Sequence, residues 1–101
     1  MEYFIYGIII PKKTYYDWMM KINPNTLNEI KTNGYIIHEY NGRDGVYFLF
    51  GKKIVDKENT NTLNNPIIVP EISDDEKLNI VININKYFST KQTFHYYFVT
   101  N

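Results

Sequence analysis

The apolar run from Tyr3 to Ile10 constrains the fold of this chain more than any other segment. It is rich in aromatic and β-branched residues, which favour strands, and it ends at Pro11. Both its odd-numbered and its even-numbered residues are apolar, so a strand here would have to be covered on both faces. We therefore expect a central strand, in which Gly7 marks a bulge or a point of tight packing.

Beyond this run the apolar residues are spaced three or four positions apart, as on one side of a helix, which predicts a helix over residues 11–22. The helical stripe consists of Tyr15, Trp18, Met19 and Ile22. A proline then interrupts the pattern, and residues 26–31 are expected to add a short helical turn. The Asn33-Gly34 pair is a stop signal, because both residue types tolerate the left-handed conformation that ends helices.

Two strands are predicted over residues 35–40 and 46–55, joined by a hairpin loop over residues 41–45. Residues 56–65 are polar and rich in asparagine, and we expect a flexible loop there. Residues 66–70 are apolar and lie between two prolines, which argues for an extra edge segment and against a central strand.

A second helix is predicted from Ser73 to about Phe88, and it begins with a capping box. The Ser73 hydroxyl can accept the amide of Glu76, while the Glu76 carboxylate reaches back to the amide of Ser73. Its expected buried face consists of Leu78, Val81, Ile82, Ile84 and Phe88. A strand through residues 80–85 is the competing interpretation, which the cap disfavours. A last strand is predicted over residues 93–100.

These elements follow the order β-α-β-β-α-β in a single domain, residues 1–101. The simplest architecture is an α+β two-layer sandwich of the ferredoxin-like kind with an antiparallel sheet. The first and third strands would be central, the second and fourth would lie at the edges, and residues 66–70 would add an edge segment.

Composition narrows the classes of function. A formal net charge of zero lacks the global basic excess that indicates a nucleic-acid or membrane-surface partner. The absence of cysteine excludes disulfides, thiolate nucleophiles and thiolate metal sites. The N-terminal run is too short for a membrane span and wrongly flanked for a secretory signal, so we expect a cytoplasmic protein with no membrane partner.

Four residue types, Ile, Asn, Lys and Tyr, make up almost half of the chain, and alanine is absent. Those four have A/T-rich codons, so the composition suggests an AT-rich genome, such as that of a large DNA virus, a phage or a low-GC microbe. A host-directed viral factor within an infected cell is one expectation from this bias.

The sheet face opposite the helices is the expected site of function. If Ile5 and Ile9 face the helices, alternation places a tyrosine-rich set on the other face. The predicted partner-binding residues are Phe4, Tyr6, Tyr47, Leu49, His95 and Tyr97, with His38 and Tyr40 extending the patch. Such a face is typical of a subunit interface, of a surface covered by loops, or of a stacking platform for bases.

Our first hypothesis is a small non-enzymatic protein-interaction module. It would bind a protein partner, or a second copy of itself as a homodimer, through this aromatic face or an edge strand.

The first alternative is a single-stranded nucleic-acid binder that stacks bases on the same aromatics. Its phosphate contacts would be Lys52, Lys53, Lys86 and Lys91. RNA-recognition domains share the element order and carry aromatics on their central strands. Residues 45–50 take the place of their main motif, but Asp44 and Val46 depart from it.

The second alternative is a small hydrolase or phosphoesterase, which would need His38 or His95. The chain holds no Gly-rich phosphate loop, nucleophile elbow or metal-binding helix motif. We therefore predict no catalytic residue, metal or cofactor.

Overall fold

A four-stranded antiparallel sheet organises the protein, whose computed structural model describes residues 2–54 and 71–100. Its strands are β1 (Glu2–Pro11), β2 (Tyr35–Gly42), β3 (Gly45–Ile54) and β4 (His95–Thr100). The order across the sheet is β2-β3-β1-β4, so the prediction that the first and third strands are central is confirmed.

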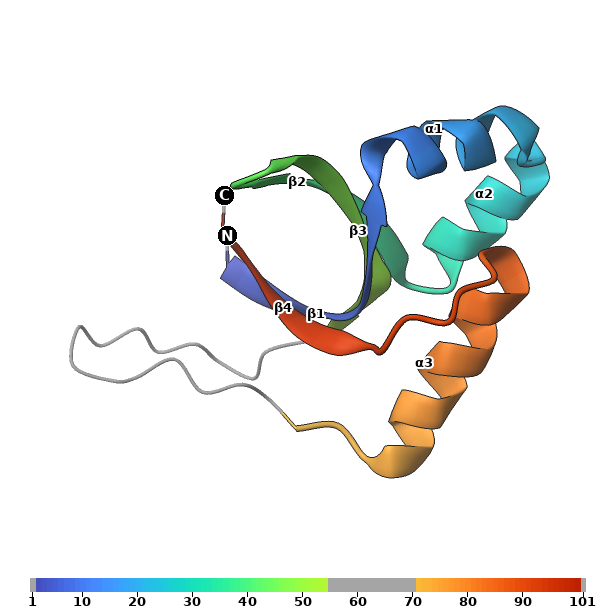
Figure 1. Ribbon diagram of the computed structural model, residues 1–101. Coiled ribbons are helices and arrows are strands. Elements are labelled where there is room, and N and C mark those ends of the chain that lie inside the picture. The colour runs from blue at the N-terminus through green and yellow to red at the C-terminus, as the bar shows by residue number, and fades with distance from the viewer. Residues whose placement is uncertain (1, 55–70, 101) are drawn as a thin grey trace.

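The helices of the described residues are α1 (Lys12–Lys21), α2 (Pro24–Thr32) and α3 (Asp74–Tyr87). All three lie on one side of the sheet, and the sheet curls away from them (Figure 1). The protein is therefore a small α+β structure with a four-stranded antiparallel sheet and three helices in its described part. The expected loop over residues 56–65 and the expected edge segment over residues 66–70 lie outside the described residues.

The proline after α1 begins a helix instead of only ending one. Pro24 occupies the first turn of α2, where its missing N–H is not needed, and the Asn23 side chain accepts the Asn25 amide at 2.8 Å. The expected short turn is therefore a nine-residue helix. It ends as predicted before Gly34, whose φ of 87° is left-handed.

The predicted N-terminus of α3 is confirmed, because the Ser73 hydroxyl accepts the Glu76 amide at 3.1 Å. The competing strand interpretation is wrong. The expected buried face is also partly wrong: Ile80 and Ile84 are buried, whereas Leu78 and Ile82 are 59% and 58% exposed. The apolar residues of α3 are distributed over several of its sides, so the sequence pattern alone does not determine which side packs against the sheet.

The main core lies between the sheet and the helices. Even-numbered residues of β1 enter it, together with Phe50 of β3, Ile30 of α2, and Ile80 and Ile84 of α3. The β1 members are Phe4, Tyr6, Ile8 and Ile10. The expected orientation of β1 is therefore wrong by one residue, because the odd-numbered Ile5 belongs to a cluster on the opposite face.

The predicted stripe of α1 is confirmed as its packing face. Tyr15 stacks on Phe48 with ring centroids 3.8 Å apart, and Trp18 contacts Phe50 at 5.6 Å. The Trp18 indole N–H also donates to the backbone carbonyl of Tyr87 at 2.9 Å. This bond joins α1 to the last residue of α3 and satisfies a carbonyl that the helix end leaves without an intrahelical partner.

The two central strands approach each other too closely for side chains at one point. Gly7 and Gly51 are cross-strand partners. A Cβ on Gly7 would overlap the Phe50 carbonyl oxygen and lie 2.6 Å from the Gly51 Cα, and one on Gly51 would lie 2.9 Å from the Gly7 Cα. The predicted tight packing at Gly7 is confirmed, and glycine pairs of this kind allow a sheet to bend.

The hairpin between β2 and β3 is tighter than predicted. β2 continues to Gly42 and β3 begins at Gly45, so only Arg43 and Asp44 form the turn. The register then places Tyr40 opposite Tyr47 and His38 opposite Leu49.

Candidate functional site

The register places four of the six predicted partner-binding residues on the concave face of the sheet, the one opposite the helices. Tyr47 and Leu49 pair with odd-numbered residues of β1, and so do His95 and Tyr97. Phe4 and Tyr6 are absent from this face, because both are buried in the helix-side core. The six residues therefore do not form one surface.

The concave face is not a flat platform. At its centre Ile5 and Leu49 are fully buried and Val99 is 4% exposed, with Ile9 and Tyr97 packed around them. Figure 1 shows the curl of the sheet, and this apolar cluster lies on its concave face.

Two tyrosines of the concave face, Tyr40 and Tyr97, lie on the edge strands β2 and β4. Burial raises the pKa of the Tyr97 hydroxyl above its ordinary value, and the charge of Tyr40 raises it further.

The predicted basic residues do not converge on one phosphate site. The Lys52 amino group lies 6.0 Å from the ring centroid of Tyr35, and that of Lys53 lies 4.8 Å from the ring of Tyr3. Because the lysines are adjacent on β3, they point to opposite faces. The other two lie elsewhere: Lys86 is on α3 beside Glu29, and Lys91 is exposed between α3 and β4.

The two histidines lie on different edge strands of the sheet. His38 is on β2 and His95 is on β4, where the His95 ring meets Tyr97 edge-on at 6.3 Å. Among residues 2–54 and 71–100, no three His, Asp or Glu side chains are grouped closely enough to hold a metal ion.

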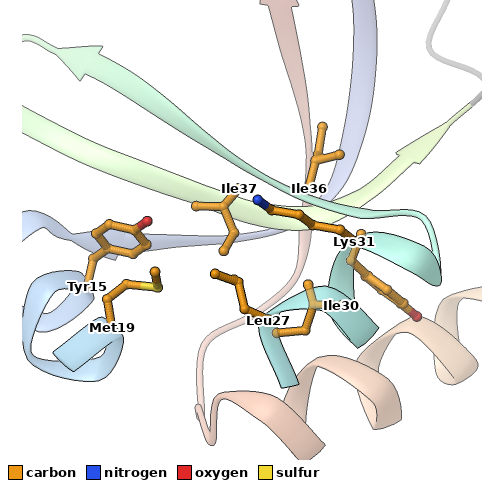
Figure 2. A pocket seen from close by; sticks show the side chains of 8 residues that line it. Tyr15, Met19, Leu27, Ile30, Lys31, Ile36 and Ile37 are labelled. Carbon is orange, nitrogen blue, oxygen red and sulfur yellow. The ribbon is translucent and has the colours of Figure 1, made fainter. Parts of the chain in front are cut away.

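An apolar groove opens on the helix side of the sheet, beside the edge strand β2. Its cavity volume is about 340 Å³, which is at the lower end of the range of ligand sites. Its walls are Tyr15 and Met19 of α1, Leu27, Ile30 and Lys31 of α2, and residues 35–37 of β2. Figure 2 shows the ends of Met19 and Leu27 facing each other below Ile37, with the Lys31 amino group alongside.

The groove exists because α1 and α2 are two separate helices and not one continuous helix. The Asn23 cap and Pro24 start a new helix, and α1 and α2 run in different directions from the turn that joins them (Figure 1). Of the lining residues, Ile30 is fully buried and Tyr35 nearly so, whereas Met19, Leu27 and Ile37 keep intermediate exposure. The groove therefore presents aliphatic side chains that the fold has not covered.

A second cavity, here called the seam, lies farther along the same strand, between β2 and β4. It has a volume of about 240 Å³ and is lined by His38, Glu39, Tyr40 and Asn41 of β2 and by Phe98 and Val99 of β4. Its lining is more polar than that of the groove. The seam is the place where the curl of the sheet brings its two edges face to face.

Groove and seam together form one site along the outer edge of β2, here called the β2-edge site. The groove borders residues 35–37 and the seam borders residues 38–41, so the two are consecutive. Among the described residues β2 pairs only with β3, which leaves the N–H and C=O groups of every second residue on its outer edge without a strand partner.

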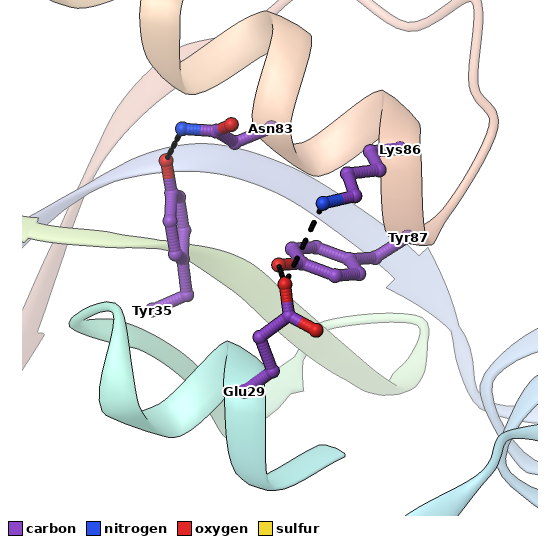
Figure 3. A network of polar contacts seen from close by, with 5 residues as sticks. All are labelled: Glu29, Tyr35, Asn83, Lys86 and Tyr87. Carbon is purple, nitrogen blue, oxygen red and sulfur yellow. Dashed lines mark hydrogen bonds and ion pairs between the residues drawn. The ribbon is translucent and has the colours of Figure 1, made fainter. Parts of the chain in front are cut away.

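The start of β2 is joined to α3 by a side-chain hydrogen bond, as Figure 3 shows. The Asn83 amide donates to the Tyr35 hydroxyl at 2.9 Å. Nearby, the Tyr87 hydroxyl donates to the Glu29 carboxylate at 2.9 Å, and the Lys86 amino group lies 3.5 Å from the same carboxylate. These bonds fix α2 and α3 relative to the groove.

The same network shifts two pKa values. The hydrogen bond from Tyr87 and then the charge of Lys86 lower the pKa of Glu29. Burial, followed by the bond to Glu29, raises the pKa of Tyr87. Both shifts favour the charged carboxylate and the neutral phenol that the hydrogen bond requires.

Sequence reasoning named an edge strand as a candidate surface but did not identify the groove. The available signal was the Ile36-Ile37 pair, because edge strands are usually protected by proline, lysine or a bulge. The groove itself depends on the presence of two separate helices, α1 and α2. For the second of these, the sequence predicted only a short helical turn.

Comparisons with models of known protein families, with curated proteins and with solved structures found no match to this chain. Among the described residues, no helix is both long and apolar enough to cross a membrane.

Proposed function

We propose that the protein is a small interaction module that binds an extended segment of a partner protein along the outer edge of β2. The observation that carries this proposal is the succession of groove and seam along an edge of β2 that no other described strand pairs with. Main-chain hydrogen bonds to an added strand would supply affinity, and the pockets beside the strand would select side chains.

The groove defines which segment fits. In an added strand, side chains two residues apart point the same way, about 6.6 Å from each other. A volume of about 340 Å³ accommodates one or two apolar side chains between Met19, Leu27 and Ile37. We therefore expect a partner segment with apolar residues at alternate positions and no proline where it pairs with β2.

This function is favoured over the stacking of single-stranded nucleic acid. Base stacking needs exposed ring faces on the central strands. Here Phe4 and Tyr6 are in the helix-side core, and Leu49 at the centre of the concave face is fully buried. Lys52 and Lys53 also point to opposite faces, so they do not form one track for phosphates.

We also propose that the fold is ferredoxin-like. The antiparallel order β2-β3-β1-β4 and the position of the helices on one side of the sheet support this assignment. The added helix α2 between α1 and β2 is the departure from the simple β-α-β-β-α-β order, and it is also what forms the groove.

The test is a selection from a displayed library of random nine-residue segments on the immobilised protein. We expect the enriched segments to carry apolar residues at alternate positions. Met19→Lys and Ile37→Lys place a charge in the groove and should each lower the binding of those segments at least tenfold, because the ammonium group would lose hydration against apolar walls.

Leu78→Lys is the matched control, because it adds the same charge at an exposed apolar residue of α3. It should bind the enriched segments as the wild type does. Circular dichroism of each variant separates loss of binding from loss of fold, and Met19, which is not buried, provides the test if Ile37→Lys unfolds. Enriched segments without the alternate pattern, or segments that bind both groove variants as tightly as the wild type, would show that the proposal is wrong.

A further inference from the structure

The two ends of the β2-edge site differ in charge. Among the described residues that line the groove, Lys31 alone is formally charged, and Lys52 adds a second ammonium group near Tyr35 at the same end. Of the seam's lining residues in the described part of the chain, Glu39 alone is formally charged. One end of the site is therefore basic and the other acidic.

Neighbouring charges do not cancel this difference. Glu29 is two residues from Lys31, but its carboxylate is already engaged by the Tyr87 hydroxyl and the Lys86 amino group. At the other end, Arg43 and Asp44 in the hairpin turn contribute one charge of each sign.

The ends are far enough apart to act on different residues of one ligand. Tyr35 and Glu39 are four residues apart on β2, which corresponds to about 13 Å along a strand. This exceeds the Debye length of about 8 Å at physiological ionic strength, so each end affects mainly the ligand residue next to it.

We infer that the segment bound along β2 is dipolar. It carries an acidic residue beside the apolar residue that fills the groove, and a lysine or arginine at the seam. There the Glu39 carboxylate supplies the opposite charge, and the rings of Tyr40 and Phe98, 40% and 36% exposed, supply faces that attract cations. This inference rests on the proposed function and names the chemistry of its partner.

The experiment uses the best segment from the selection, synthesised in two forms: as selected, and with its acidic and basic residues exchanged. Binding of both peptides is measured by fluorescence anisotropy to the wild type, Lys31→Glu, Glu39→Lys and the double variant. Lys91→Glu is the control, because Lys91 is an exposed lysine outside the β2-edge site.

We expect each single variant to bind the selected peptide about three- to tenfold more weakly, since an exposed attraction becomes a repulsion. The double variant should prefer the exchanged peptide, and Lys91→Glu should match the wild type. Selected segments with alternate apolar residues but no opposite charges, or variants that bind both peptides equally, would overturn the dipolar inference and leave the proposed function standing. Failure to enrich any segment that depends on the groove would overturn both.

Discussion

Single residues determine how closely the central strands approach. Side chains in a sheet normally point out of its two faces and clear the neighbouring strand, but at the cross-strand pair Gly7 and Gly51 there is no room for a Cβ atom. The added Cβ of an alanine at either position would meet backbone atoms of the opposite strand, and backbone atoms in the middle of a sheet cannot move aside as a side chain can.

Gly7→Ala should lower the free energy of unfolding by about 3 kcal/mol or more, the upper end of the cost of overpacking. Gly42→Ala is the control, because its Cβ would lie 3.3 Å from the edge of the Tyr47 ring, which is able to shift. It should cost less than about 1 kcal/mol. Urea denaturation of both variants gives the comparison, and equal losses would contradict the close approach.

The Glu29 carboxylate makes the contact between α2 and α3 sensitive to pH. Its pKa in the folded protein is lowered, so its contribution to stability is complete above the unfolded pKa and is lost as the pH falls through the folded pKa. We expect the stability difference between wild type and Glu29→Gln to shrink from neutral pH to acid.

Denaturation at several pH values between 7 and 3 measures this difference. Glu71→Gln, at an exposed residue before α3, is the control and should follow the wild type throughout. A difference between wild type and Glu29→Gln that stays constant with pH would show that the Glu29 contacts do not contribute.

At the scale of the element, the packing side of α3 is set by its partners more than by its own pattern. Ile80 and Ile84 are one turn apart and enter the core, and Asn83 reaches Tyr35 from the same helix. Leu78 and Ile82, also one turn apart, remain exposed.

Two alanine substitutions separate these sides. Ile80→Ala removes a fully buried side chain and should cost about 2–5 kcal/mol, while Ile82→Ala should stay within about 0.5 kcal/mol of the wild type. Both substitutions replace isoleucine by alanine within α3, so the change in helix propensity is the same for both. A larger loss for Ile82→Ala would restore the packing side expected from the sequence.

Local signals predicted the elements well, because each depends on neighbouring residues. The Ser73 cap, the stripe of α1 and the stop at Gly34 follow from side chains within one helical turn. The side of an element that packs against the core was predicted poorly where both of its sides carry apolar residues, as in β1 and α3. The candidate site was predicted only as an edge strand or an aromatic face, because the groove depends on packing between segments distant in sequence.

At the scale of the whole molecule, the curl of the sheet brings its two edges together. The pKa of Tyr97 is raised by burial first and by Tyr40 second, although the two residues belong to opposite edge strands. Neutral Tyr97 is the form that the fold favours, so its contribution to stability is complete below the unfolded pKa and is lost as the pH rises through the folded pKa.

Tyr40→Phe should lower the pKa of Tyr97 but leave it above its ordinary value, because burial remains the larger cause. The ¹³Cζ chemical shift of labelled tyrosine, followed against pH, measures this. Tyr47→Phe is the control: Tyr47 is the cross-strand partner of Tyr40 and is not among the causes of the shift. An unchanged Tyr97 titration in Tyr40→Phe would contradict the approach of the two edges.

The position of Trp18 gives the molecule a built-in optical reporter. It is the only tryptophan in the chain, it contacts the rings of Phe50 on β3 and Phe88 after α3, and its indole N–H is bonded to the Tyr87 carbonyl. Its emission therefore depends on α1, the sheet and the end of α3 at once. Without any added label, a shift of the Trp18 emission maximum to longer wavelength reports separation of these elements. Ligand binding that leaves them in place keeps the emission wavelength unchanged.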